Sequence, residues 1–176
     1  MDIVVAQKLL VGSKFYMMTT LGYILGLDLV TASFFKVQLP DEARNSRTAK
    51  FAGGQHSKLY LVDAKGLQLC IWHGDGVGQW VLVDTISVRE ACGHLNVQRW
   101  KPDDGCTAPV KVFAVGDNAE FVILELVASG IVCCMQVGNR VVEKVAVGVL
   151  QNYTARVLPI TMVWPPIFPV DKASQE

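Results

Sequence analysis

The chain has 176 residues, of which 51% are hydrophobic and 18% charged, and this composition excludes a disordered chain. Sixteen basic residues balance sixteen acidic ones, so no charge excess favours nucleic acid or a membrane surface as a partner. We expect one domain over residues 1–170 and a disordered tail over residues 171–176.

The first long apolar run, Phe15–Phe35, has the length of a transmembrane helix, and its only charge is Asp28. A central Asp is costly in a bilayer, and the glycines, threonines and aromatic residues of the run suit strands and turns. We therefore expect strands here and no membrane partner, with a small membrane-associated β protein as an alternative.

A short phrase occurs twice, as SKFYMMTTLG at Ser13–Gly22 and as SKLYLVDAKG at Ser57–Gly66. Each copy is followed by apolar runs that turn residues interrupt, and a looser third unit begins near residue 119. Asp75-Gly76 and Gly138-Asn139 lie between apolar runs, which indicates hairpins. Units of about 40–50 residues with about four strands each are typical of β-propeller blades.

The predicted fold is therefore all-β and antiparallel, a partial β-propeller of about three blades. We interpret the repeated phrase as the opening strand of successive blades, with Lys and Tyr at a blade edge and Gly in the next turn. A sandwich of hairpins is the competing architecture. One short helix is expected near Val88–Leu95, in an insertion, because Ser87 and Glu90 have the spacing of a capping box.

No motif predicts catalysis, a metal or a cofactor. The HGDGVG segment, His73–Gly78, lacks the dinucleotide-binding spacing and is followed by a strand, so it indicates a hairpin turn. Cys92, His94 and Cys106 do not complete a zinc site, even with His56 or His73 added from elsewhere. The odd number of cysteines predicts reduced thiols and a cytoplasmic or nuclear location. An enzyme that uses Cys92 or His94 is a further, weaker alternative.

Three tryptophans are the candidate protein-binding residues. Trp72 and Trp80 flank the HGDGVG hairpin and are expected to pack across it. Trp100 lies at the edge of the insertion and is the best candidate for an exposed contact. Packing in the core or on the hairpin is the alternative for each.

Several phrases, in this order, resemble the C-terminal part of plant F-box proteins, particularly the large grass families. They are LYLVDAKGLQLCIWHGDGVGQWVLVDTISV, VGDNAEFVILEL, RVVEKV and PITMVWPPIFPV, and the likeness runs over roughly Lys8–Val170. In that family an N-terminal F-box binds the Skp-type adaptor of a cullin ubiquitin ligase, and the F-box-associated propeller is taken to hold the substrate. The resemblance implies a non-catalytic module for substrate recognition, with an unknown protein target.

We identify no F-box in this sequence. The stretch that begins at Leu39, LPDEARNSRTAKF, opens like one but has too few apolar residues at helical spacing. Binding to a Skp-type adaptor is therefore not expected. A truncated relic or gene-model fragment is the alternative, and it predicts self-association through open sheet edges.

Overall fold

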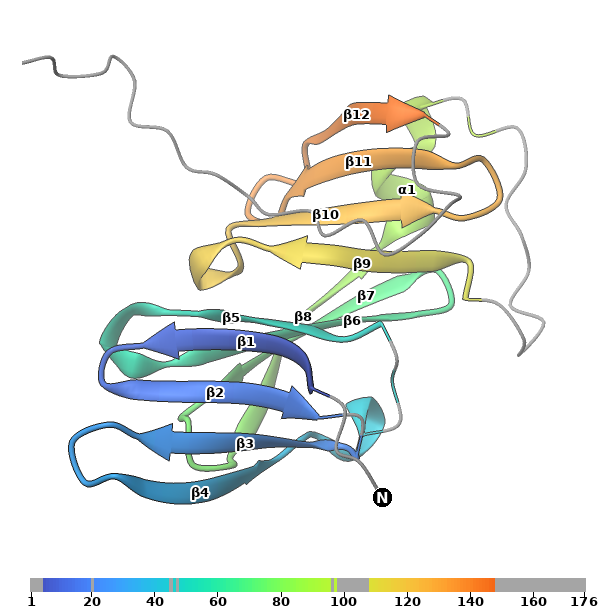
Figure 1. The fold of residues 1–176 in the computed structure, drawn as a ribbon. Helices are drawn as coiled ribbons and strands as arrows, with labels where there is room; N and C mark the ends of the chain where they lie inside the picture. The colour runs from blue at the N-terminus through green and yellow to red at the C-terminus, as the bar shows by residue number, and fades with distance from the viewer. Residues whose placement is uncertain are drawn as a thin grey trace, which may run out of the picture.

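The computed structural model describes residues 5–19, 21–44, 46, 48–95, 97 and 108–147, which form three four-stranded antiparallel sheets (Figure 1). The first sheet contains β1 (Val5–Val11), β2 (Lys14–Thr19), β3 (Tyr23–Asp28) and β4 (Ser33–Gln38). The second contains β5 (Lys50–Gly53), β6 (Leu59–Lys65), β7 (Gln68–Gly74) and β8 (Trp80–Ser87). The third contains β9 (Val110–Val115), β10 (Phe121–Leu126), β11 (Ile131–Gln136) and β12 (Val142–Val147).

Within each sheet, strands that follow one another in the sequence pair side by side. The first strands of neighbouring sheets are in contact, β1 with β5 and β5 with β9. Figure 1 shows the sheets extending from this line of first strands in different directions. Four-stranded antiparallel sheets around a common centre are the architecture of propeller blades, so the predicted all-β partial propeller of about three blades is confirmed.

The repeated phrase lies on the second strand of each sheet, and the prediction that it forms the opening strand was wrong. Its copies form β2 and β6, and the third unit begins at β10. The first strand of the second sheet, β5, has only four residues and offers little periodicity to recognise. The repeated Tyr is not on an edge strand, because Tyr16 and Tyr60 lie on strands that pair with a neighbour on each side. The predicted turn glycines are confirmed, since Gly22 and Gly66 have φ angles of +78° and +57°.

The apolar membrane-length run is divided among strands. Phe15–Phe35 covers most of β2, all of β3 and the first half of β4, with turns between them. Asp28 ends β3, and its Oδ1 accepts hydrogen bonds from the N–H groups of Val30 and Thr31 in the turn that follows. Among the described residues, no helix has the length and apolar character needed to cross a membrane.

The core consists of two layers, one on each side of the second sheet. Leu59 and Leu61 of β6 belong to the layer that also holds Tyr16 and Ile24 of the first sheet. Side chains from the opposite face of the second sheet belong to the layer shared with the third sheet, namely Val62, Leu69, Ile71 and Ile86. Because successive side chains of a strand point to opposite faces of the sheet, each strand of the second sheet contributes to both layers.

The predicted helix forms as α1 (Val88–Ala91), followed by a 3₁₀ turn at Gly93–Leu95. Ser87 caps it, because its Oγ accepts a hydrogen bond of 3.3 Å from the Glu90 N–H. Val88 and Cys92 are fully buried in the layer between the second and third sheets. The described part of the insertion therefore contributes to the core, as well as connecting two blades.

The first two sheets are joined at their inner strands by one glutamine. Gln7 of β1 donates from Nε2 to the Phe51 carbonyl at 2.6 Å, and its Oε1 accepts from the Phe51 N–H at 2.9 Å. Both backbone groups of a fully buried residue on β5 are thereby satisfied by a side chain of another blade.

The connection between these sheets is fixed by a buried carboxylate. Asp63 of β6 is almost completely buried, and its Oδ1 accepts hydrogen bonds from the hydroxyl groups of Ser46 and Thr48. Burial raises the pKa of the Asp63 carboxyl, although the two hydroxyl hydrogen bonds oppose that shift.

We predict that Gln7→Ala lowers the free energy of unfolding by about 1–3 kcal/mol, because it leaves two buried backbone groups of Phe51 unpaired. Chemical denaturation measures this change. The exposed Gln79→Ala is the matched control and should leave stability unchanged. Equal stability of the two variants would show that Gln7 does not hold the blades together.

We predict that Asp63 makes the stability depend on pH. Its folded-state pKa lies above the unfolded value, so its contribution is present at low pH and is lost as the pH rises through the folded pKa. In Asp63→Asn, which keeps the oxygen acceptor, this loss should disappear. Urea denaturation from pH 4 to pH 8 tests it, with the exposed Asp117→Asn as control. Parallel curves for wild type and Asp63→Asn would contradict the prediction.

Candidate functional site

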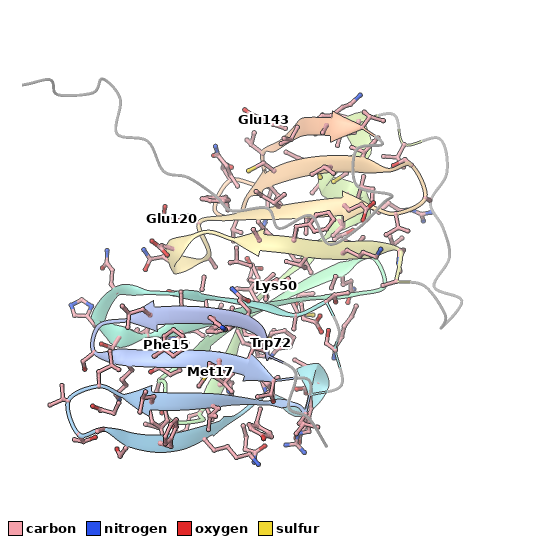
Figure 2. All side chains as sticks on the ribbon, in the orientation of Figure 1. Phe15, Met17, Lys50, Trp72, Glu120 and Glu143 are labelled. Atoms are coloured by element: carbon pink, nitrogen blue, oxygen red, sulfur yellow. The ribbon has the colours of Figure 1, made fainter. Side chains whose placement is uncertain are left out.

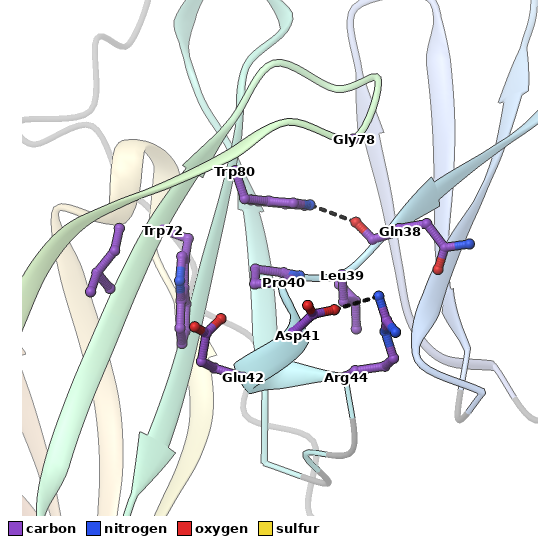
Figure 3. A pocket seen from close by; sticks show the side chains of 10 residues that line it. Gln38, Leu39, Pro40, Asp41, Glu42, Arg44, Trp72, Gly78 and Trp80 are labelled. Carbon is purple, nitrogen blue, oxygen red and sulfur yellow. Dashed lines mark hydrogen bonds and ion pairs between the residues drawn. The ribbon is translucent and has the colours of Figure 1, made fainter.

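A groove of about 450 Å³ lies between the end of the first sheet and the outer strands of the second (Figure 3). Residues of both sheets and of the segment that connects them line it: Gln38, Leu39, Pro40, Asp41, Glu42, Arg44, Trp72, Gly78, Trp80 and Leu82. Two of the three tryptophans predicted to bind protein are among them. Concave sites with a few fixed aromatic and polar groups are typical of binding sites.

Both tryptophans lie on the same face of the β7–β8 hairpin. Trp80 is opposite Gly74, whereas Trp72 is opposite Leu82, so the two rings are diagonal neighbours. The two rings are therefore not directly opposite each other, and their packing across the hairpin stays a prediction. Trp72 is only 4% exposed, and Trp80 is half-buried.

Two contacts fix the ring of Trp80. One face lies against Gly74, where a Cβ atom would come within 2.7 Å of the ring. Its Nε1–H donates a hydrogen bond of 2.7 Å to the carbonyl of Gln38 at the end of β4 (Figure 3). Trp80 therefore links the first two blades at their outer strands, and the link also holds the side chain in place for contact.

The HGDGVG segment forms the hairpin loop that the sequence predicted. Asp75 Oδ1 accepts hydrogen bonds from the N–H groups of Val77, Gly78 and Gln79 at 2.9, 3.1 and 3.1 Å. These backbone hydrogen bonds hold the pKa of the Asp75 carboxyl below its usual range. The loop amides thus bind an internal carboxylate, and the hairpin places Trp80 at the start of β8.

The second wall of the groove is a 3₁₀ turn, Asp41–Ala43, which follows Pro40. Asp41 forms an ion pair of 2.6 Å with Arg44 three residues later. Glu42, in the same turn, lines the groove together with Trp72 (Figure 3). In the sequence this stretch opens like an F-box and gives no indication of a binding site. The turn and the two tryptophans line one groove because of packing between residues far apart in the sequence, which short sequence patterns do not indicate.

The residues considered for zinc or catalysis have structural contacts instead. His94 Nε2 forms a hydrogen bond of 2.9 Å with the Val142 carbonyl of β12. Cys92 is buried next to Cys133 of β11, and the hydrogen bond between the two thiols, together with burial, raises the pKa of the Cys133 thiol. His73 packs against Tyr60, with ring centroids 5.0 Å apart. In the described part of the chain, no three His, Cys, Asp or Glu side chains are grouped to hold a metal ion.

Other sequence expectations fall outside the described residues. These are the candidate contact residue Trp100, the potential zinc ligand Cys106, the proline-rich segment Pro159–Pro169 and the tail at 171–176. The reduced-thiol expectation agrees with the cysteines that the structure describes, since Cys70, Cys92, Cys133 and Cys134 are not joined in disulfides.

We predict that Gly74→Ala displaces the Trp80 ring, because the new methyl group would overlap it. Stability should fall by about 1–3 kcal/mol, and the indole N–H resonance of Trp80 should shift as its bond to Gln38 is lost. Denaturation and ¹H–¹⁵N spectra measure the two effects. Gly138→Ala is the control, because nothing lies within 4 Å of its Cβ position. An unshifted Trp80 resonance in Gly74→Ala would contradict this account of the site.

Comparison with protein families identifies the fold. The model described as "F-box protein AT5G49610-like, beta-propeller" matches residues 4–168, which is nearly the whole chain. A comparison with curated proteins gave no match. The match agrees with the four-stranded sheets and with the resemblance noted in the sequence. The chain therefore belongs to the F-box protein AT5G49610-like β-propeller family.

Proposed function

We propose that the chain is a non-catalytic protein-binding module that serves as the substrate-recognition part of an F-box subunit of a cullin ubiquitin ligase. Membership of an F-box protein propeller family supports protein interaction as the general role. The ligase context would place the bound target near the ubiquitin-transfer machinery, so recognition needs contacts and no covalent step by this chain. Its proposed location is the cytoplasm or the nucleus.

The observation that carries the proposal is the groove between the first two blades. Tryptophan is enriched among the residues that dominate binding energy, especially when it is rigid and partly buried. Trp80 meets both conditions, because Gly74 supports its ring and the Gln38 carbonyl orients its N–H. A target segment can therefore bind there without ordering the side chain first, which lowers the entropic cost of binding.

The experiment is affinity purification of the tagged chain from plant cells, followed by mass spectrometry. We predict target proteins whose recovery from wild type falls about tenfold or more with Trp80→Ala, the scale of a hot-spot residue. Val145→Ala is the matched control, because it removes an exposed apolar side chain from β12, in the third sheet.

Each outcome has a definite meaning. Recovery of Skp-type adaptor and cullin together with Trp80-dependent targets would support the full proposal. Trp80-dependent targets without ligase subunits would support recognition and contradict the ligase role. Targets recovered equally well with Trp80→Ala would contradict the groove as the recognition site.

Self-association is a second candidate role, and the outward face of the first sheet favours it. A row of apolar residues crosses all four strands of this face, with Leu10, Phe15, Leu27 and Phe34 in register. Leu10 and Phe34 are 59% and 67% exposed. Figure 2 shows the neighbouring Phe15 and Met17 on β2. An apolar face of this kind is a typical site of protein association.

We predict that Phe34→Lys shifts the chain toward the monomer if this face mediates association, because a charge would be buried in the contact. Light scattering coupled to size-exclusion chromatography measures the mass. Val77→Lys, at an exposed residue of the β7–β8 loop, is the control. A wild-type chain that is monomeric at all concentrations would exclude this role.

A further inference from the structure

We propose that the groove between the first two blades binds a cationic side chain, Arg or Lys, of the partner protein. This inference rests on the proposed function and specifies the chemistry of the segment that the groove would recognise. It derives from three features of the described groove: the charges of its lining, its aromatic side chains and the hydrogen bonds that are already formed within it.

The charge of the described lining favours a cation. Asp41, Glu42 and Arg44 are its ionisable side chains, which gives two negative charges and one positive charge. Arg44 is paired with Asp41 at 2.6 Å, whereas Glu42 is an exposed side chain of the same lining (Figure 3). A guanidinium or ammonium group at this point would form a charge-assisted hydrogen bond with the Glu42 carboxylate.

The aromatic side chains favour the same ligand. Cations bind over the faces of aromatic rings, and tryptophan has the strongest attraction of this kind. Trp72 and Trp80 both border the groove, but Trp72 is only 4% exposed, so the ring available to a ligand is the half-buried Trp80, which Gly74 supports from behind. The flat guanidinium of arginine can stack on such a ring while its N–H groups reach a carboxylate, so arginine fits this combination particularly well.

The internal hydrogen bonds argue against two other ligand classes. Grooves that bind proline-rich segments use aromatic walls, and a free indole N–H would be the natural donor to the ligand's backbone. Here the Trp80 Nε1–H is already bonded to Gln38. An anionic ligand is disfavoured as well, because Glu42 would repel it and the amides of the adjacent loop are bonded to Asp75.

The test uses a small probe, N-acetyl-arginine-N-methylamide, and its neutral isostere derived from citrulline. Each is titrated into the ¹⁵N-labelled chain, and the indole N–H resonance of Trp80, assigned from Trp80→Phe, is followed. We expect a saturable shift with the arginine probe in the millimolar range and binding at least about fivefold weaker for the citrulline probe, since one charge-assisted interaction is lost.

Two variants make the test specific. Glu42→Gln, at an exposed residue, should weaken binding of the arginine probe about five- to tenfold without changing the fold. Glu143→Gln, at an exposed glutamate on β12, is the matched control and should bind as wild type does. Equal binding of the two probes, unchanged binding by Glu42→Gln, or no effect of the arginine probe on Trp80 would each overturn the inference.

The probe experiment also separates this inference from the proposed function. Trp80-dependent protein targets that Glu42→Gln still binds normally would leave the proposed function intact and overturn the cationic site. A groove that binds the arginine probe through Glu42, in a chain without Trp80-dependent protein targets, would support the cationic site and contradict the proposed function.

Discussion

The structure depends on one constraint, the burial of the second sheet on both of its faces. An ordinary antiparallel sheet can expose one face to water, but β6 and β7 have apolar side chains pointing both ways. Leu61 needs the first sheet, and Val62 needs the third. The central blade is therefore stable only between two others, and a four-stranded unit of this sequence would not be expected to fold alone.

The groove follows from the same packing. The first two sheets are tightly joined near the centre, where Gln7 binds both backbone groups of Phe51. Farther out, Val37 of β4 and Trp72 of β7 still belong to the shared apolar layer, and the Trp80–Gln38 hydrogen bond joins the outer strands. The groove lies beside this link, between the second sheet and the turn after Pro40.

Local signals in the sequence were sufficient for the fold class and insufficient for the inner strands. The hairpins at Asp75-Gly76 and Gly138-Asn139 and the helix cap at Ser87 depend on interactions between residues a few positions apart. They could therefore be predicted. The short strand β5 owes its position to neighbours on both sides, so its four residues have no pattern of their own. The phrase that repeats visibly is the second strand, which pairs with a strand on each side in both sheets.

For the site, the sequence identified the two tryptophans and missed the acidic turn. Trp72 and Trp80 are close in the chain, and their hairpin could be predicted from its turn residues. Glu42 lines the same groove as Trp72 because the connection between blades runs along the second sheet, where Asp63 holds Ser46 and Thr48. An arrangement that depends on a buried carboxylate many residues away has no local sequence signature.

Neighbouring blades are alike in backbone but are linked differently at their outer strands. The backbone repeats closely: His56 and Ser57 have positive φ angles before β6, as Asn118 and Ala119 do before β10. The outer links differ in chemistry. At the first junction an indole of the β7–β8 hairpin donates to a carbonyl of β4, and a groove remains beside it.

At the second junction, Arg140 after β11 donates from its Nη2 atom to both carboxylate oxygens of Asp84 on β8, at 2.9 and 2.7 Å. There the cation and the carboxylate are both supplied by the chain, and they satisfy each other. The first junction has the carboxylate of Glu42 and aromatic rings. Its β7–β8 hairpin provides Trp80, whereas the β11–β12 hairpin of the second junction provides Arg140. A partner's cationic side chain would complete at the first junction the kind of interaction that the second makes within the chain.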